Sequence, residues 1–356
     1  MYSILRLMLL EISINLILSG CGIIKHNQKN RPTNNFMPAD MIISSSRSIQ
    51  LADEAENTES ILPSIEDFAI QQDSGYVFII TPESELMKID RMGTIIFKKR
   101  VYGQGPGEIT IPTMLRYRNN KVYILDSGAQ KVAVYDNHGC WKADIKYNNC
   151  AIESFDVDWN ENLIIPNTIQ LNAADEPLFL VISPEGNKIN QISQNKHIKE
   201  DFVSSFPRPV IYITPDSCLV LVFRIHGSFY KFNMNGDLLF TADIKGGQEW
   251  NDSVKAEMDE YNKTKLKFFQ WRLNYMYFRL DGSIFAAWGG NFKDQVTLCM
   301  IYNSKGFFVG RLFQSEAFPY LPQRIALLND STFWIYSETA NQLAECAIRN
   351  INQEND

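Results

Sequence analysis

The chain has 356 residues, of which 45% are hydrophobic, with a formal net charge of −7 and a pI near 5.3. This length and hydrophobic content allow a large core, in one big all-β domain or two smaller ones, and exclude a disordered chain. The acidic balance and the lack of any Lys/Arg run exclude an electrostatic surface for nucleic acid, so we expect no nucleic-acid partner.

The first twenty residues, 1–20, are mostly apolar and lead into Leu18-Ser19-Gly20-Cys21. This tetrapeptide resembles the lipobox of bacterial lipoproteins, which implies a signal peptide over 1–20, a mature N-terminus at Cys21 and a lipid on that thiol. Two features depart from a good signal, because Arg6 is its only basic residue and Glu11 interrupts the apolar run. The alternatives are a mis-assigned start or a membrane helix, but a helix needs about 20 apolar residues without a charge.

Residues 21–40 are polar and rich in Asn, a composition typical of a flexible tether. No acidic run follows Cys21, and such a run is associated with outward display in some bacterial groups. The expected location is therefore the periplasmic face of the outer membrane, reached through the lipid at Cys21. Among the other cysteines, Cys140 and Cys150 could form a bridge, whereas Cys218 and Cys299 lie in apolar runs and are expected to be buried.

A short signal recurs between the tether and the polar tail at 351–356. An alternating apolar strand is followed by a polar residue, two variable positions and a glycine, at intervals of 46, 47, 50 and 70 residues. The glycines are Gly93, Gly139, Gly186, Gly236 and Gly306. Four short strands surround each one, which is the size of a propeller blade. The predicted units span 65–102, 114–147, 155–193, 210–244 and 275–313, with an incomplete three-strand unit at 324–348.

The incomplete last unit would leave an open sheet edge. Residues 41–51 are apolar and β-prone enough to fill that gap, so we expect this N-terminal strand to close the last blade. The longer interval before Gly306 contains residues 251–273, in which Val254, Met258 and Tyr261 recur at helical spacing. We therefore predict an all-β, six-bladed β-propeller over 41–350, with four-stranded blades and one helical insertion between blades 4 and 5.

The connection after the first unit reads GQGPGE, from Gly103 to Glu108. Three glycines and a proline in six residues cannot form a strand or helix interior, so the chain must turn sharply here. Gly105-Pro106-Gly107-Glu108 has the composition of a type II turn, because proline fixes φ at its second position and glycine takes the positive φ at its third.

The whole pattern resembles the six-bladed β-propeller lipoproteins of Bacteroidota-type bacteria, a group of NHL/TolB-like propellers. The residues that carry the resemblance are the lipobox at Cys21, the closing strand, the GQGPGE turn and hairpins such as YDNHG, which ends at Gly139. The resemblance covers about residues 41–350. It implies architecture and envelope location, but no reaction, because the family is largely without assigned biochemistry.

In such a ring, the blade-to-blade connections and the loops between second and third strands emerge on one face, where we expect a ligand to bind. Glu108 has two interpretations, a ligand contact or an acceptor for turn N–H groups. The glycine amides could form an anion-binding nest. Trp288 could stack on a sugar or peptide, or pack on the next blade. The candidate ligand-binding residues are Glu108, Asp126, Arg224, His226, Trp271, Arg272, Trp288, Asn291 and Glu338.

The leading hypothesis is a non-catalytic binding or scaffold module that holds an envelope protein, peptide or glycan, without a cofactor. The alternative is a cation-dependent hydrolase or lyase of the propeller lactonase type, with Ca²⁺ at the ring axis. Its ligands would be Asp126, Asn167, Asn291 and Glu338, which come from four predicted blades. Convergence of three of them on one point would favour the enzyme.

Overall fold

The computed structural model describes residues 41–49, 51–52, 59–60, 63–147, 152, 154–167, 177–194, 209–223, 227–243, 273–279, 281–288, 297–313, 324–338 and 340–350. The lipobox, the tether and the polar tail lie outside these residues. So does the predicted helix over 251–273, except Leu273, which begins a strand. Among the described residues, no helix is long and apolar enough to cross a membrane.

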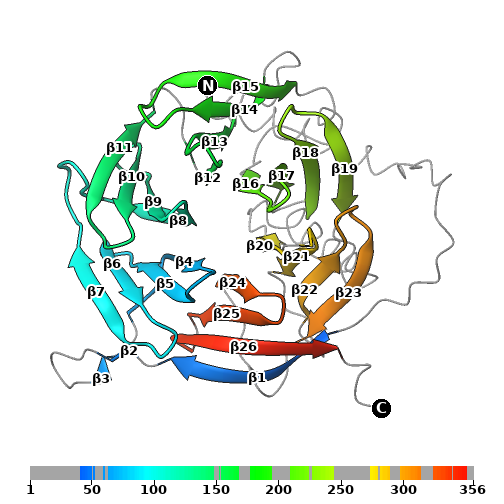
Figure 1. Cartoon of the computed structure of the whole chain (residues 1–356), viewed down its shortest axis with the longest axis horizontal. Coiled ribbons are helices and arrows are strands. Elements are labelled where there is room, and N and C mark those ends of the chain that lie inside the picture. The colour runs from blue at the N-terminus through cyan, green and yellow to red at the C-terminus, as the bar shows by residue number, and fades with distance from the viewer. Residues whose placement is uncertain are drawn as a thin grey trace, which may run out of the picture.

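The described strands form an all-β, propeller-like ring of sheets, four of which are each built from four consecutive antiparallel strands (Figure 1). The first sheet contains β4 (Asp67–Gln71), β5 (Tyr76–Ile80), β6 (Glu85–Ile89) and β7 (Ile95–Arg100). The second contains β8 (Pro112–Arg118), β9 (Lys121–Asp126), β10 (Lys131–Asp136) and β11 (Trp141–Lys146). Their central strands are rich in Val, Ile, Leu and Tyr and are buried on both faces, because neighbouring sheets pack on each side.

Two further four-stranded sheets follow along the chain. The third contains β12 (Asp156–Val157), β13 (Leu163–Pro166), β14 (Pro177–Ile182) and β15 (Lys188–Gln194). The fourth contains β16 (Pro209–Ile213), β17 (Cys218–Phe223), β18 (Ser228–Asn233) and β19 (Leu238–Asp243). In each sheet the first strand lies nearest the centre of the ring and the last strand lies outermost, as Figure 1 shows.

The remaining strands make one eight-stranded sheet and a short ribbon of β2 (Leu51–Ala52) and β3 (Glu59–Ser60). The large sheet begins with β20 (Leu273–Phe278), β21 (Ile284–Trp288), β22 (Thr297–Tyr302) and β23 (Phe308–Phe313). It continues through β1 (Met41–Ile49) and β26 (Gln342–Asn350) to β25 (Thr332–Ser337) and β24 (Arg324–Asn329). Again β20 and β24, the first strands of their series, lie nearest the centre (Figure 1).

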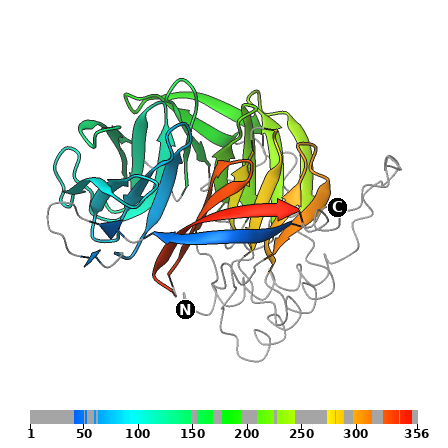
Figure 2. The same cartoon turned by 60° about the horizontal axis from the view of Figure 1, so that its bottom comes forward.

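The N-terminal strand joins the two ends of the ring. β1 pairs antiparallel with the last strand, β26, from Met41 opposite Asn350 to Ile49 opposite Leu343. It also pairs in parallel with β23, where Met41 and Ile42 lie opposite Leu312 and Phe313. Figure 2 shows β1 and β26 side by side across the front of the molecule. The predicted pairing of the N-terminal segment with the last unit is therefore found.

The recurring glycines lie in the hairpins between the third and fourth strands of each series. At Gly139 the φ angle is +73°, and the glycine N–H donates to the Asp136 carbonyl at 3.0 Å. The Asp136 carboxylate accepts the N–H groups of His138 and Cys140, both at 2.9 Å. Asp90, Asn233 and Asn303 accept N–H groups in the same way, so a short polar side chain and a glycine together build each turn.

These hairpin glycines also bring neighbouring sheets together. A Cβ atom at Gly139 would lie 2.7 Å from the Phe97 ring in the preceding sheet. One at Gly306 would lie 2.4 Å from the Phe240 ring, and one at Gly186 would lie 2.7 Å from the Lys146 backbone carbonyl. The outermost strand of one sheet therefore packs directly on the hairpin of the next.

The described cysteines are free thiols. Cys140 is exposed and free, so it does not form the bridge with Cys150 that the sequence left open. Its position in the tight Asp136 hairpin explains its exposure. Cys218 and Cys299 are buried, as predicted, and so is Cys346. Burial raises the pKa of the Cys346 thiol to about 12, so this group is a small apolar side chain of the core.

Candidate functional site

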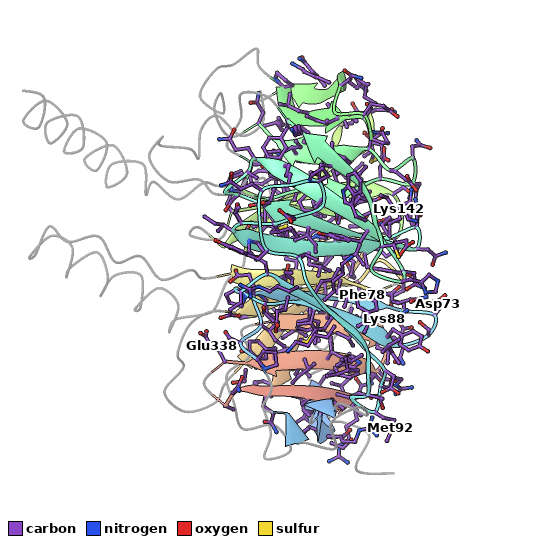
Figure 3. The ribbon with its side chains drawn as sticks, turned by 90° about the vertical axis from the view of Figure 1, so that its left-hand side faces the viewer. Asp73, Phe78, Lys88, Met92, Lys142 and Glu338 are labelled. Atoms are coloured by element: carbon purple, nitrogen blue, oxygen red, sulfur yellow. The ribbon has the colours of Figure 1, made fainter. Side chains whose placement is uncertain are left out.

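The ring has two faces that differ in which connections they carry. Figure 3 views the ring from the side and shows Glu338, in the turn after β25, at one face and Asp73, in the turn after β4, at the opposite face. The predicted site lies on the Glu338 face. Five of its residues, Arg224, His226, Trp271, Arg272 and Asn291, lie outside the described residues, and Trp288 is described only as the backbone end of β21.

Asp126, a predicted ligand, makes its contacts with neighbouring segments of its own chain. Its side chain is fully buried at the end of β9. One carboxylate oxygen accepts the Thr110 N–H at 2.9 Å, and the other accepts the Thr110 hydroxyl at 2.8 Å and the Ile111 N–H at 3.0 Å. The N–H groups of Gly128 and Ala129 also donate to it, at 3.1 and 3.2 Å. Five donors leave this carboxylate little capacity for a ligand or cation.

Asn167 and Glu338 are the other described residues of the predicted cation site. Asn167 is buried after β13, and its amide nitrogen donates to the Pro177 carbonyl at 3.0 Å. Glu338 is exposed. Within the described ranges, no three His, Cys, Asp or Glu side chains gather as a metal site.

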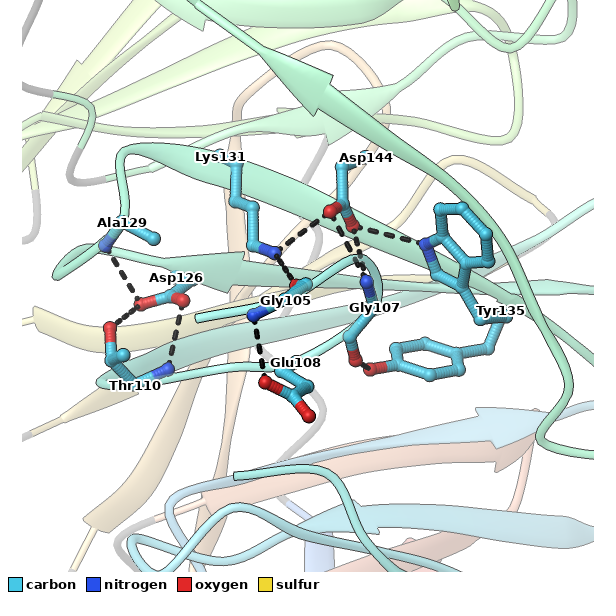
Figure 4. Close-up of polar contacts among 10 residues, drawn as sticks. Gly105, Gly107, Glu108, Thr110, Asp126, Ala129, Lys131, Tyr135 and Asp144 are labelled. Carbon is cyan, nitrogen blue, oxygen red and sulfur yellow. Dashed lines mark hydrogen bonds and ion pairs between the residues drawn. The ribbon is translucent and has the colours of Figure 1, made fainter. Parts of the chain in front are cut away.

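The GQGPGE connection has the geometry of a type II turn. The Glu108 N–H donates to the Gly105 carbonyl at 3.0 Å, and Gly107 has a φ of +70°. The Glu108 carboxylate folds back over the turn and accepts the Gly105 N–H at 2.7 Å (Figure 4). A Cβ atom at Gly103 would lie 2.1 Å from that carboxylate, so the glycine leaves room for the acid.

The turn is anchored on the second sheet by a small polar cluster (Figure 4). Lys131 on β10 donates to the Gly105 carbonyl at 3.1 Å and to Asp144 on β11 at 2.8 Å. Asp144 also accepts the Gly107 N–H and the Trp141 indole N–H, at 3.2 and 3.1 Å. The Tyr135 hydroxyl donates to the Gly107 carbonyl. These contacts between the turn and the second sheet support a structural role for the turn.

Replacing Glu108 with alanine is expected to lower the free energy of unfolding by about 1 kcal/mol, because one hydrogen bond to the turn is lost. Glu108→Gln keeps an acceptor oxygen and should lose less. Chemical denaturation without any ligand is the measurement. If both variants keep full stability but lose binding of a partner, Glu108 is a ligand contact and its turn role is wrong.

A cavity of about 530 Å³ lies among the innermost strands at the ring centre and reaches the Asp73 face. Its lining comes from β4, β8, β12, β16, β20 and β24 and from the turns that follow several of them. The lining includes aliphatic side chains and a set of charged and aromatic ones. The charged and aromatic residues are Asp67, Phe68, Asp73, Arg116, Tyr117, Arg118, Asp156, Trp159, Tyr212, Tyr277, Phe278 and Arg324.

The interior charges of this cavity are paired loosely. Asp67 lies 3.7 Å from Arg116 and 3.6 Å from Arg324, and Asp156 lies 4.0 Å from Arg118. Burial opposes the charge of Arg116, but Asp156 and Asp67 outweigh that cost and raise the pKa of its guanidinium. Arg116 therefore remains a cation at the centre of the ring.

The same aspartates hold neighbouring sheets together. Asp67 accepts the Leu115 N–H of the second sheet at 2.8 Å, and Asp156 accepts the Ile213 N–H of the fourth sheet at 2.6 Å. In the same way, the Tyr212 hydroxyl on β16 of the fourth sheet accepts the Met276 N–H on β20 of the next sheet, at 3.3 Å. The Asp67 and Asp156 carboxylates consequently have fixed positions in the cavity wall.

Trp159 lies at the rim of the cavity and is held in one orientation. Its indole N–H donates to the Ser217 hydroxyl at 2.9 Å, and its carbonyl accepts from the Asn119 amide at 3.1 Å. The Arg118 guanidinium lies 4.4 Å from the ring centre. Even so, the residue is 52% exposed. A fixed and exposed aromatic ring beside a cavity is a suitable surface for stacking.

The sequence prediction missed this cavity. Arg116, Asp67 and Asp156 lie in separate short strands, and polar residues in strands are usually solvent-exposed. One signal was available, because Asp67 and Asp156 both stand at the first position of an innermost strand. Their alignment across the repeat indicates a shared position on the ring axis.

No family model matches the sequence, and no curated protein matches it either. Solved structures are similar in fold. One is a member of the DUF4221 family from Bacteroides vulgatus, with a TM-score of 0.56 and 9% identity, covering 88% of this chain and 99% of that one. A candidate exported protein from Bacteroides fragilis has a TM-score of 0.55 and 11% identity, covering 88% and 97%.

A streptogramin B lyase is also similar, with a TM-score of 0.52 and 10% identity, covering 85% of this chain and 97% of the lyase. At these identities the likenesses show the fold alone. They agree with the propeller-like arrangement of the sheets.

Proposed function

We propose that this protein is a non-catalytic binding module of the bacterial envelope that takes a small ligand in its central cavity. The observation that carries the proposal is the cavity itself, about 530 Å³, lined by charged and aromatic side chains from the innermost strands. Concave sites of this size with a few fixed polar groups are typical of ligand pockets. The walls belong to regular strands, so the pocket exists without rearrangement.

The proposal includes the architecture and location predicted from the sequence. The eight-stranded sheet counts as two four-stranded blades that touch through the two residue pairs between β1 and β23, which gives six blades. A lipid on Cys21 would attach the ring to the outer membrane. The fold likeness to a candidate exported protein of Bacteroides fragilis supports an envelope location.

A thermal-shift screen of the full chain tests this function. The probes are sugars, sugar acids, amino acids and dipeptides. A ligand at a hundredfold its Kd stabilises the folded state by about 2.7 kcal/mol, so the Tm should rise by several degrees. Ala326→Leu places a larger side chain in the cavity wall on β24. It should weaken the affinity for a ligand of the central cavity at least tenfold.

Glu338→Ala is the control at the opposite face, and it should leave that affinity unchanged. If a ligand is weakened by Glu338→Ala and not by Ala326→Leu, the loop-bearing face binds it and the central cavity does not. If no probe shifts the Tm of the parent chain, the proposed function fails.

A further inference from the structure

The charges inside the central cavity are balanced by their neighbours. Its three arginines lie 3.6 to 4.0 Å from Asp67 or Asp156. Arg324 also donates to the Glu66 carbonyl at 3.1 Å. Burial raises the pKa of the Glu66 carboxyl, and the charge of Arg324 opposes that rise, so this carboxyl also faces the arginine. The interior therefore offers no surplus charge to an ionic ligand.

The rim of the cavity carries uncharged polar groups that are held in place. Asn119 and Asn120 form the two-residue turn between β8 and β9, with φ angles of +51° and +59°. The Asn119 amide nitrogen donates to the Trp159 carbonyl at 3.1 Å, and the Asn120 oxygen accepts the Tyr117 hydroxyl at 3.0 Å. Burial and the nearby Asp73 carboxylate raise the pKa of Tyr117 to about 12, so its hydroxyl stays a donor. The Asn119 oxygen and the Asn120 amide nitrogen, both on exposed side chains, are left for a ligand.

Trp159 provides an ordered aromatic surface beside these amides. The Arg118 guanidinium lies over the indole, 4.4 Å from the ring centre, and the indole N–H donates to the Ser217 hydroxyl at 2.9 Å. The residue is nevertheless 52% exposed, so the second face of the ring remains for a ligand. Because the indole N–H is already used, that ligand contacts the π face. Little side-chain entropy is lost when a ligand stacks on a surface that is already ordered.

We infer that the mouth of the cavity binds a pyranose unit of a neutral saccharide. The apolar face of the sugar lies on the Trp159 ring, whose negative π surface attracts the slightly positive C–H groups. The sugar hydroxyls contact Asn119, Asn120 and Asp73, because each hydroxyl both donates and accepts and these side chains supply donors and acceptors together. A sugar acid is disfavoured, because the Asp73 carboxylate at the rim repels a second carboxylate. This inference rests on the proposed function and names its ligand class.

Calorimetric titration of the full chain tests this ligand class. The neutral probes are maltotriose, cellotriose, mannotriose and lactose, which differ in sugar and linkage. Glucuronate is the anionic probe, and uracil is a flat heteroaromatic ring that also stacks on an indole. At least one neutral saccharide should bind more tightly than both glucuronate and uracil. If either of these two probes binds more tightly than every neutral saccharide, the inference is overturned.

Variants of two exposed tryptophans locate the binding. Trp159→Ala should weaken the affinity for the bound saccharide about tenfold, because the stacking surface is lost. Trp159→Phe keeps an aromatic face, so it should still bind the saccharide but lose the change in tryptophan fluorescence that binding causes in the parent chain. Trp141→Phe is the matched control, because Trp141 is 43% exposed and its indole N–H also donates to one side chain, Asp144. This control should keep both the affinity and the fluorescence change.

Two results separate this inference from the proposed function. A saccharide whose affinity and fluorescence change survive in both Trp159 variants does not stack on that ring, and the inference is then wrong. If ligands sensitive to Ala326→Leu exist but no neutral saccharide is among them, this inference fails while the proposed function stands.

Discussion

Replacing Asp126 with alanine is expected to lower the free energy of unfolding by about 3–5 kcal/mol, the range measured when one partner of a buried charged network is removed. The Asp126 carboxylate is fully buried and accepts hydrogen bonds from the Thr110 hydroxyl and from the N–H groups of Thr110, Ile111, Gly128 and Ala129. Alanine leaves these five donors without their shared acceptor. Chemical denaturation of the full chain measures the loss.

Asp330→Ala is the matched control for this variant. Asp330 is 58% exposed and pairs with Arg279 at 3.1 Å at the protein surface. Exposed ion pairs contribute about 1 kcal/mol or less, so this second aspartate should be almost dispensable. Equal losses for the two variants would show that Asp126 does not organise the loops around it.

The same carboxylate makes stability depend on pH. Burial alone would raise the pKa of Asp126, but its hydrogen bonds from Ile111, Thr110 and Ala129 outweigh burial and lower the pKa below its ordinary value of 3.8. Because the folded pKa lies below the unfolded one, the stabilisation is complete above about pH 4. It is lost as the pH falls from there through the folded pKa. Denaturation curves between pH 7 and pH 2 should show this acid loss, reduced in Asp126→Ala.

Gly186→Ala is expected to cost about 3 kcal/mol, more than a glycine in an ordinary turn. Its φ is +85°, a region in which an alanine costs roughly 1–2 kcal/mol. The new Cβ would also lie 2.7 Å from the Lys146 carbonyl, and a backbone atom in a paired strand cannot move aside cheaply. The sheets on either side would have to separate locally.

Gly75→Ala separates these two contributions. Gly75 has a similar φ of +74°, but its added Cβ would meet the flexible side chain of Arg91, which is half exposed and can move at the cost of a surface ion pair with Glu345. We expect a loss of about 1–2 kcal/mol there, mainly from the backbone. If the two alanine variants unfold at the same denaturant concentration, the contact between Gly186 and Lys146 has no energetic importance.

The features that the sequence predicted well are local. Asp136 and Gly139 build their hairpin within a few residues, since the carboxylate accepts two nearby N–H groups and the glycine takes a positive φ. Gly105, Pro106 and Gly107 similarly contain nearly all the information for their turn. Repetition of such turns along the chain is enough to indicate a ring of short-stranded sheets.

The features that the sequence did not predict depend on residues that are far apart in the chain. Asp126 ends a strand before Ser127 and Gly128, and from the sequence its carboxylate could equally face a ligand or the chain. The Thr110 hydroxyl donates to this carboxylate only because the connection between β7 and β8 passes the end of β9. The cavity likewise forms only because Asp67, Arg116 and Asp156 lie close together at the ring axis. No pattern within a few residues of the sequence predicts that proximity.

The position of β1 has a consequence for the order of folding. Ile49 and its partner Leu343 lie almost at opposite ends of the chain, and so do Met41 and Asn350. During synthesis, β1 can form its antiparallel pairs only after β26 has been made. Contacts of such long sequence separation form slowly, because loop entropy is lost before they stabilise the fold. We expect β1 to dock last, and a ribosome-bound chain without β26 to expose β1 to proteases.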